Sequence, residues 1–281
     1  MAVVTDSVAD LPASLYRENG ITVVPLSVIF GDEIFHDQID ITSEQFFSRL
    51  RTAKTMPSTS QPSPAEFIEV YDRLIREYDY VFSVHASAKL SGTFQSATIA
   101  RDTLESGKIE VIDTANASAA EGFAALAGAR AVKAGLDPAR VREAIHSSIA
   151  STRILFTVDT LEFLQRNGRI GKASSLLGTL LAIKPIISVA DGVVTPVEKV
   201  RGSGRVLPRV LELMEESMGG APQPIRVAVL HADAEERAAQ WSEGIRLRFE
   251  CAELFTAQIG PVVGTHAGPG TLGVVWRPYE V

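Results

Sequence analysis

The sequence predicts an α/β protein with two α/β domains, the first built on a doubly wound, mostly parallel sheet and the second on a mixed sheet with helices. In the first half, short apolar runs alternate with helical patterns and short turns, which is typical of parallel βαβ units. In the second half, Asp191-Gly192 lies between two β-rich runs and predicts a hairpin. The length of 281 residues fits two domains better than one, and we place them at 1–151 and 152–281.

In the first half, the expected strands are short apolar runs and the expected helices begin at capping residues or prolines. Strands are predicted at 2–5, 21–30, 80–84 and 109–112. Helices are predicted after Pro12, after Thr42, after Ser63-Pro64, from Ser91, over 117–134 and after Asp137. The segment 56–64 is rich in Ser, Thr and Pro and is predicted to be a loop.

In the second half, β-rich runs become more frequent. Strands are predicted at 154–158, 185–189, 193–197, 225–230, 254–258 and 272–276. The pattern favours helix over 160–183, over 206–218 and once more between the last three strands. The run 260–270 holds four glycines and two prolines and is predicted to be a loop with an unusual backbone path.

Composition excludes several kinds of function. The net charge is −7, from 27 basic and 34 acidic residues, so nucleic acid is a poor partner because phosphate binding needs a basic footprint. Cys251 is the only cysteine and the five histidines are scattered, so we expect neither a disulfide nor a metal site. The N-terminus shows no signal-peptide pattern and no apolar run is long enough to span a membrane, so we expect a cytoplasmic protein.

A candidate anion site lies at Ser91-Gly92-Thr93, directly after a predicted strand. In a parallel sheet, a helix that begins there offers unpaired N–H groups and the positive end of its dipole. Ser91 and Thr93 add hydroxyls, and Gly92 allows close approach, so the expected ligand group is a carboxylate or phosphate. The alternative is that Ser91 only caps the helix. Ser87 is a weaker candidate in the same segment.

Two further segments could contribute to such a site. The run 57–63, with Thr59 and Ser60, is either a hydroxyl-lined turn that accepts an anion or a solvated loop with capping residues. His266 lies within the Gly-rich run 260–270, and Thr265 beside it is a weaker candidate. A histidine held in such a run is either a site residue or a structural one.

Basic residues in the second half suggest contact with a partner or its nucleotide. They are Arg169, Lys172, Arg201 and Arg205. The alternative is helix capping together with solvated charges. The Gly171-Lys172 pair lacks the spacing and the following Ser or Thr of a phosphate-binding loop, so that motif is rejected.

Taken together, these segments resemble the DegV family, which includes the FakB fatty-acid-binding subunits of bacterial fatty acid kinase. The likeness covers the whole chain, and its strength lies in the order and spacing of the matching segments. These are Thr5-Asp6-Ser7, Pro25-Leu26-Ser27-Val28, Thr59-Ser60-Gln61-Pro62, Leu90-Ser91-Gly92-Thr93, Asn167-Gly168-Arg169-Ile170, Lys184-Pro185-Ile186, Glu198-Lys199-Val200-Arg201, and Gly260-Pro261-Val262-Val263 with His266. Ala88-Lys89 departs from the pattern, which leaves the role of Ser87 open.

The resemblance implies a non-catalytic carrier without a cofactor. It would bury one palmitate- or oleate-like fatty acid, hold the carboxylate with Thr59, Ser91 and His266, and present it to a fatty acid kinase that forms an acyl phosphate. Transient contact with a membrane is compatible with this role. Phe123 and Leu126, in the Ala/Gly-rich helix 117–134, are candidates for lining the acyl tunnel, and the alternative is close packing of that helix on the sheet.

Two other functions compete with this one. A lipid-binding sensor would bind the same ligand without delivering it to a kinase. An acyl hydrolase would use Ser91 and His266, but the sequence has no nucleophile elbow and no evident acid to orient the histidine.

Overall fold

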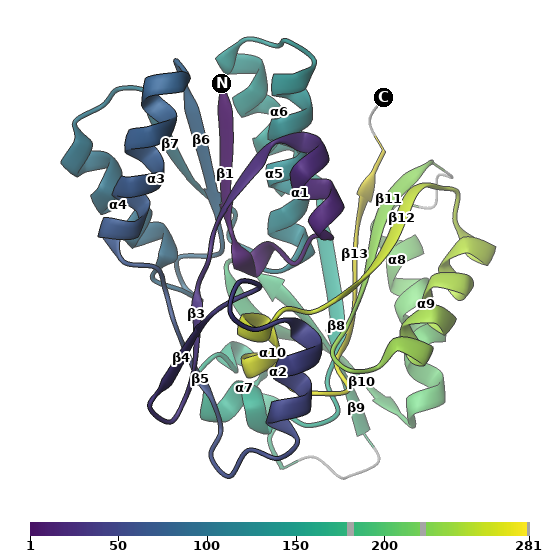
Figure 1. Ribbon diagram of the computed structural model, residues 1–281. Helices are drawn as coiled ribbons and strands as arrows, with labels where there is room; N and C mark the ends of the chain where they lie inside the picture. Colours follow the sequence, from purple (N-terminus) through teal and green to yellow (C-terminus); the bar gives the residue numbers. More distant parts are fainter. Residues whose placement is uncertain (179–182, 220–222, 280–281) are drawn as a thin grey trace.

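The computed structural model describes residues 1–178, 183–219 and 223–279, and Figure 1 shows its arrangement. The first sheet is parallel and four-stranded, in the order β2-β1-β6-β7. Its strands are β1 (Ala2–Asp6), β2 (Ile21–Val24), β6 (Val81–His85) and β7 (Ile109–Asp113). Helices α3 (Pro64–Glu77) and α4 (Thr93–Leu104) lie on one face, and α1 (Ala13–Asn19), α5 (Ala119–Lys133) and α6 (Pro138–Ser151) lie on the other. This confirms the predicted doubly wound architecture.

The second sheet is mixed, as predicted, with six strands in the order β10-β9-β8-β13-β11-β12. They are β8 (Arg153–Thr157), β9 (Ile183–Ala190), β10 (Val193–Arg201), β11 (Ile225–His231), β12 (Cys251–Gln258) and β13 (Leu272–Pro278). Helices α8 (Val206–Ser217) and α9 (Glu235–Arg248) pack on it over an apolar cluster around Trp241 and Met214. Asp191 and Gly192 have φ of 53° and 78°, as a type I′ hairpin turn requires, and they connect β9 to β10.

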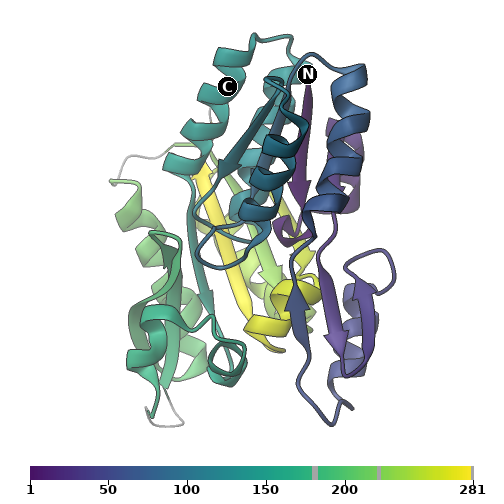
Figure 2. The same cartoon turned by 90° about the vertical axis from the view of Figure 1, so that its left-hand side faces the viewer.

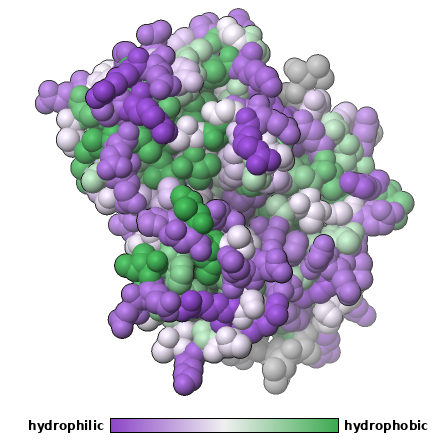
Figure 3. Space-filling view, in the orientation of Figure 1, coloured by the Kyte–Doolittle hydropathy of each residue, from purple (hydrophilic) through white to green (hydrophobic). Residues whose placement is uncertain are grey.

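A third sheet, which the sequence analysis did not predict, holds β3 (Ser27–Phe30), β4 (Glu33–His36) and β5 (Ser58–Ser60) in the order β4-β3-β5. The run predicted as one strand over 21–30 therefore divides between two sheets at Pro25-Leu26. The loop predicted over 56–64 contains β5, whose three residues are too few to show an alternating pattern. Ile34, in β4, and Ile39, which follows that strand, are exposed, and Figure 3 shows hydrophobic side chains at the lower left of the molecule, where Figure 1 places this sheet.

Helix α2 (Ser43–Leu50) begins at the predicted cap, where Thr42 and Gln45 form a capping box. The predicted loop over 260–270 is wrong for most of its length, because Pro261–Ala267 form helix α10. Pro261 occupies the first helical position. Gly264 is tolerated within the helix because Phe46 and Phe47 pack against it, and a Cβ there would lie 2.9 and 2.8 Å from their rings. Tertiary packing thus outweighs the local glycine content.

The helix predicted over 160–183 is also much shorter in the structure. Helix α7 spans only Glu162–Arg166, and a 3-10 helix follows at Gly171–Leu176. Glycines at 168, 171 and 178 have positive φ and interrupt the helical path. Part of the predicted helix, residues 179–182, lies outside the described residues.

The two halves of the chain meet in one apolar core. Val3 and Phe123 from the first half share a cluster with Leu230, Val262 and Val275 from the second. Helix α10 contacts α2, β3 and β5, and Figure 2 shows it between the six-stranded and the three-stranded sheet. The boundary proposed between residues 151 and 152 falls between α6 and β8. We propose this position as the boundary between two parts that share one apolar core.

Candidate functional site

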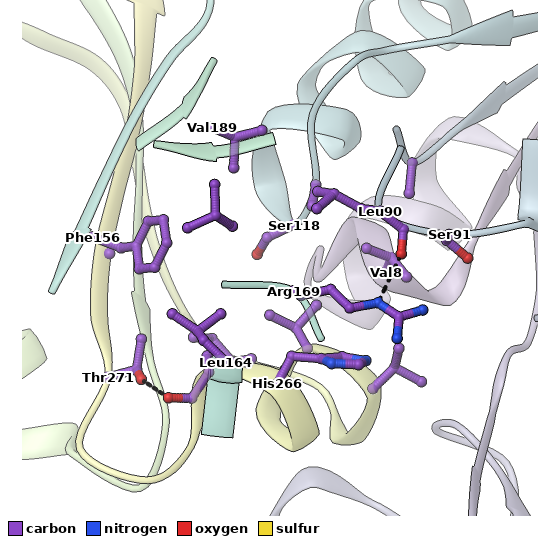
Figure 4. Close-up of a pocket in the computed structure, with 18 of the residues that line it drawn as sticks. Val8, Leu90, Ser91, Ser118, Phe156, Leu164, Arg169, Val189, His266 and Thr271 are labelled. Atoms are coloured by element: carbon purple, nitrogen blue, oxygen red, sulfur yellow. Dashed lines mark hydrogen bonds between the residues drawn. The ribbon is translucent and has the colours of Figure 1, made fainter. Parts of the chain in front are cut away.

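An apolar pocket lies between α10, the face of the six-stranded sheet and the loops that follow β1 and β6 (Figure 4). The space between its lining atoms, part of it open to solvent, is about 980 Å³. The apolar lining residues are Val8, Leu26, Ala86, Leu90, Ala117, Ile154, Phe156, Leu164, Val189, Val194, Leu230, Ile259, Val262, Val263, Ala267 and Gly273. The polar ones are Thr59, Gln61, Ser91, Ser118, Arg169, His266 and Thr271.

Thr59 and His266, both predicted as site residues, meet in this pocket. Thr59 lies on β5 and His266 on α10, and their Oγ1 and Nε2 atoms are 2.9 Å apart. Burial, and then the nearby charge of Arg169, lower the pKa of His266 from 6.5 to about 4. The imidazole is therefore neutral at pH 7 and can donate from one nitrogen only. Its Nδ1 is buried and has no hydrogen-bond partner among the described residues.

Arg169 also lines the pocket, whereas the other basic residues predicted to contact a partner do not. The Nε donates to the carbonyl of Leu90 at 3.0 Å and Nη1 donates to the carbonyl of Asn167 at 2.8 Å. Gly168, with φ of 71°, ends α7 and turns the chain so that Arg169 points into the pocket toward His266 (Figure 4). Within the described part of the chain, no carboxylate lies within salt-bridge distance of its guanidinium.

The turn at Ser91-Gly92-Thr93 presents one side chain to the pocket. Ser91 lines it, while Thr93 is buried and its Oγ1 lies 2.8 Å from the Ser91 Oγ. Gln61 packs on Gly92, where a Cβ would lie 2.8 Å from Nε2 at the flexible end of the Gln61 side chain. Gln61 itself lines the pocket and was not predicted as a site residue, although it belongs to the same run as Thr59.

Three weaker candidates lie outside the lining. The Ser87 hydroxyl donates to the carbonyl of Gly192 at 2.9 Å, so it fastens this loop to the β9–β10 hairpin. The Thr265 hydroxyl donates to the carbonyl of Pro261 at 2.8 Å, within its own helix. Ser60 pairs with Ser27 across β5 and β3. None of these three side chains lines the pocket. Their contacts hold the backbone of the segments around it.

The predicted tunnel residues Phe123 and Leu126 are fully buried in the shared core, and neither lines the pocket. The small residues of α5 allow this helix to pack closely against neighbouring side chains. A Cβ at Gly122 would lie 2.7 Å from the Leu11 side chain, and one at Gly128 would lie 2.8 Å from Ile145. The lining comes instead from Ala117 and Ser118, just before the helix begins.

The remaining basic candidates, Lys172, Arg201 and Arg205, are exposed and do not line the pocket. Residues 1–178, 183–219 and 223–279 contain no group of three or more His, Cys, Asp or Glu side chains placed to hold a metal ion. Nor does that part of the chain contain a helix long and apolar enough to cross a membrane.

The sequence analysis missed the apolar walls of the pocket. Ile154 and Phe156 on β8, Leu230 on β11 and Gly273 on β13 form part of its floor. Their period-two spacing within a strand marks one face of a sheet. Which face borders a cavity depends on the packing of α10 and β5, elements that the sequence analysis had predicted as loops.

The buried carboxyl group of Asp10 lies behind the pocket lining and is hydrogen-bonded to residues that shape it. Asp10 accepts a hydrogen bond from the N–H of Gly260, which precedes α10, at 2.8 Å, and another from the Ser118 hydroxyl at 2.5 Å. Burial raises its pKa from 3.8 to about 7. The other titratable groups that interact with it are Asp6, Asp37, Glu121 and Tyr16. Asp10 thus connects the helix that carries His266 to the lining residue Ser118.

We expect Asp10→Asn to change how stability depends on pH. Because the folded pKa of Asp10 is above 3.8, the folded protein holds a proton that the unfolded chain releases between pH 3.8 and about 7. Its contribution to stability is complete below pH 3.8 and is lost as the pH rises to about 7. Asparagine does not titrate, so the variant does not lose this contribution. The free energy of unfolding of the variant, relative to that of the wild type, should therefore rise by about 1.4 kcal/mol per pH unit between pH 5 and 6. Urea unfolding at both pH values measures this, and parallel pH profiles would contradict it.

Comparison with known proteins identifies the family. A family model described as "Uncharacterised protein, DegV family" matches residues 1–279. A DegV domain-containing protein of Streptomyces coelicolor is 38% identical over 277 residues, which cover 98% of this chain and 97% of that protein. A solved structure described as fatty acid binding of a DegV family protein from Thermus thermophilus is 34% identical, with a TM-score of 0.94 and 99% coverage of both chains. DegV of Bacillus subtilis, described as a fatty acid binding protein, is 34% identical, with a TM-score of 0.91 and 99% coverage of both chains. The chain therefore belongs to the DegV family.

Proposed function

We propose that the protein binds one long-chain fatty acid, with the carboxylate at Arg169, His266, Thr59 and Ser91 and the acyl chain along the apolar walls. The observation that carries this proposal is the position of Arg169. Its positive charge lies at a pocket lined mainly by apolar side chains, with no carboxylate within salt-bridge distance among the described residues. A ligand with one anionic group and a long apolar body would complement both features. The Thermus thermophilus and Bacillus subtilis relatives, which are described as binding fatty acids, support it.

The energetics are favourable for such a ligand. Burial of about 14 methylenes contributes on the order of 11 kcal/mol before the costs of association, and lost translational freedom and chain ordering offset several kcal/mol. A carboxylate buried without partners would cancel the gain. The guanidinium and the Ser91 hydroxyl supply partners for it, and the Thr59–His266 pair supplies one more. Because these two residues share a hydrogen bond, the third donor is either the Nδ1–H of His266 or the Thr59 hydroxyl, according to the tautomer of the imidazole.

We further propose that the protein is a non-catalytic cytoplasmic carrier that presents the carboxylate to a fatty acid kinase for acyl-phosphate formation. The exposed Lys172, Arg201 and Arg205 are its proposed contacts with that partner, and the exposed Ile34 and Ile39 are proposed to permit transient membrane contact. The geometry gives little support to a hydrolase. The Ser91 hydroxyl bonds with Thr93, and no acid among the described residues bonds the Nδ1 of His266.

Delipidated protein should bind palmitate and oleate, and His266→Ala should weaken that binding by about tenfold, the effect of one lost hydrogen bond to a charged group. Isothermal titration measures both. His146→Ala, which removes an exposed histidine on α6, is the matched control and should bind like the wild type. A wild-type protein that binds no fatty acid of any length would overturn the proposed function.

A further inference from the structure

One row of residues crosses the six-stranded sheet at the floor of the pocket. Leu230 on β11 is the direct partner of Gly273 on β13, and Gly273 is the direct partner of Phe156 on β8. Direct partners point to the same face of a sheet, and all three residues line the pocket. Gly273 therefore leaves a gap in the floor between two large side chains.

The fold does not require a glycine at this position. A Cβ at Gly273 would lie 3.5 Å from the Cβ of Phe156 and 3.7 Å from both the Leu155 carbonyl oxygen and the Cβ of Leu230, which are ordinary van der Waals distances. Its φ is outside the left-handed region. By contrast, a Cβ at Gly268 would lie 2.3 Å from the Phe163 ring. Glycine within a strand weakens it, and it often marks a place where a ligand approaches the backbone.

The gap lies away from the polar end of the pocket. In Figure 4, Phe156 is on the side opposite Ser91, with Arg169 and His266 between them. A fatty acid whose carboxylate lies near Arg169 would therefore direct its distal methylenes toward Phe156 and Gly273.

We propose that Gly273 determines which acyl chains the pocket accepts, by giving the distal methylenes of long chains room against the sheet between Leu230 and Phe156. This inference rests on the proposed function. It assigns selectivity for chain length to a position that contributes no side chain of its own. A methyl group here would fit the protein, and either a methyl or the larger isopropyl group would occupy the space of the ligand.

The test compares saturated fatty acids from 10 to 18 carbons in their binding to the wild type, Gly273→Ala and Gly273→Val. Decanoate should bind all three proteins alike. Palmitate and stearate should bind Gly273→Val at least about tenfold more weakly, as expected when one or more methylenes no longer fit, with a smaller loss for Gly273→Ala. Gly107→Ala, a change at a site with no atom within 4 Å of the added Cβ, should leave the whole series unchanged.

Phe156→Leu is the reciprocal variant, because a smaller side chain beside the gap should shift the preference toward longer chains. An equal loss for short and long acids in the Gly273 variants would show an effect on folding alone and would overturn the inference. Unchanged stearate binding by Gly273→Val would also overturn it while leaving the proposed function intact. A wild-type protein that binds none of the acids would remove both.

Discussion

Replacement of Arg169 by methionine is expected to weaken palmitate binding by about 30- to 150-fold, or roughly 2–3 kcal/mol, the range for a hydrogen-bonded charged group. Methionine keeps much of the apolar stem but removes the charge that lies beside the neutral His266. The ligand carboxylate would then enter an apolar pocket without a counterion, which is costly. Titration of palmitate at pH 8, where the ligand is ionised, measures the loss.

Two controls separate charge pairing from a change in shape. Lys172→Met, three residues along the chain at an exposed position, should bind palmitate like the wild type. Methyl palmitate carries no charge, so Arg169→Met should affect its binding much less than that of palmitate. Equal binding of palmitate by the wild type and Arg169→Met would show that the guanidinium is not the counterion.

The position of Arg169 also changes an expectation from the sequence. The sequence analysis placed Arg169 and Arg205 among the basic residues that would contact a partner, and charge reversal at a residue in that role would spare lipid binding and impair a kinase reaction. Because Arg169 lines the pocket, its reversal should now abolish fatty acid binding itself. Arg205 is exposed and does not line the pocket, so the earlier expectation still applies to that residue.

Local signals in the sequence were sufficient for most of the fold. The capping box at Thr42, the proline after Ser63 and the Asp191-Gly192 turn each act within a few residues, and each occurs where predicted. Strand β5 and helix α10 could not be predicted in this way. The first depends on pairing with β3, and the second holds a glycine that is explained only by two phenylalanines packed against it.

The site shows the same division between local and distant information. Ser91 was found because a strand followed by a helix start is a local pattern. Thr59 and His266 are 207 residues apart in the chain, and only the resemblance to a family suggested that they act together. The turn at Gly168 is a local feature, but the sequence around it does not show which side of the turn faces the pocket, because the pocket is formed by distant parts of the chain. The positions of Arg169 in the lining and of Lys172 outside it could not be predicted from that segment.

Below the pocket, a buried chain of hydrogen bonds ends at Asp6. Tyr71 donates to the Ser83 hydroxyl at 2.6 Å, Ser83 pairs with the Nε2 of His85 at 2.7 Å, and the Nδ1 of His85 lies 2.9 Å from the Asp6 carboxylate. If each hydroxyl donates onward, His85 carries its proton on Nδ1 and donates it to Asp6. The same carboxylate accepts hydrogen bonds from the N–H groups of Val8 and Ala86, which both line the pocket.

Asp6→Ala is therefore expected to lower the free energy of unfolding by about 3–5 kcal/mol, because three buried donors lose their acceptor at a cost of about 1–3 kcal/mol each. Asp6 and His85 are both fully buried, so water cannot replace the lost acceptor. Asp72→Ala is the matched control, because its pair with Arg76 is exposed and should contribute less than about 0.5 kcal/mol. Urea unfolding compares the two variants. Similar losses in both would show that the buried chain contributes no more than a surface pair. A large loss for Asp6→Ala alone, with weaker fatty acid binding under conditions where the variant is folded, would show that this carboxylate holds two strand ends in the positions that shape the pocket.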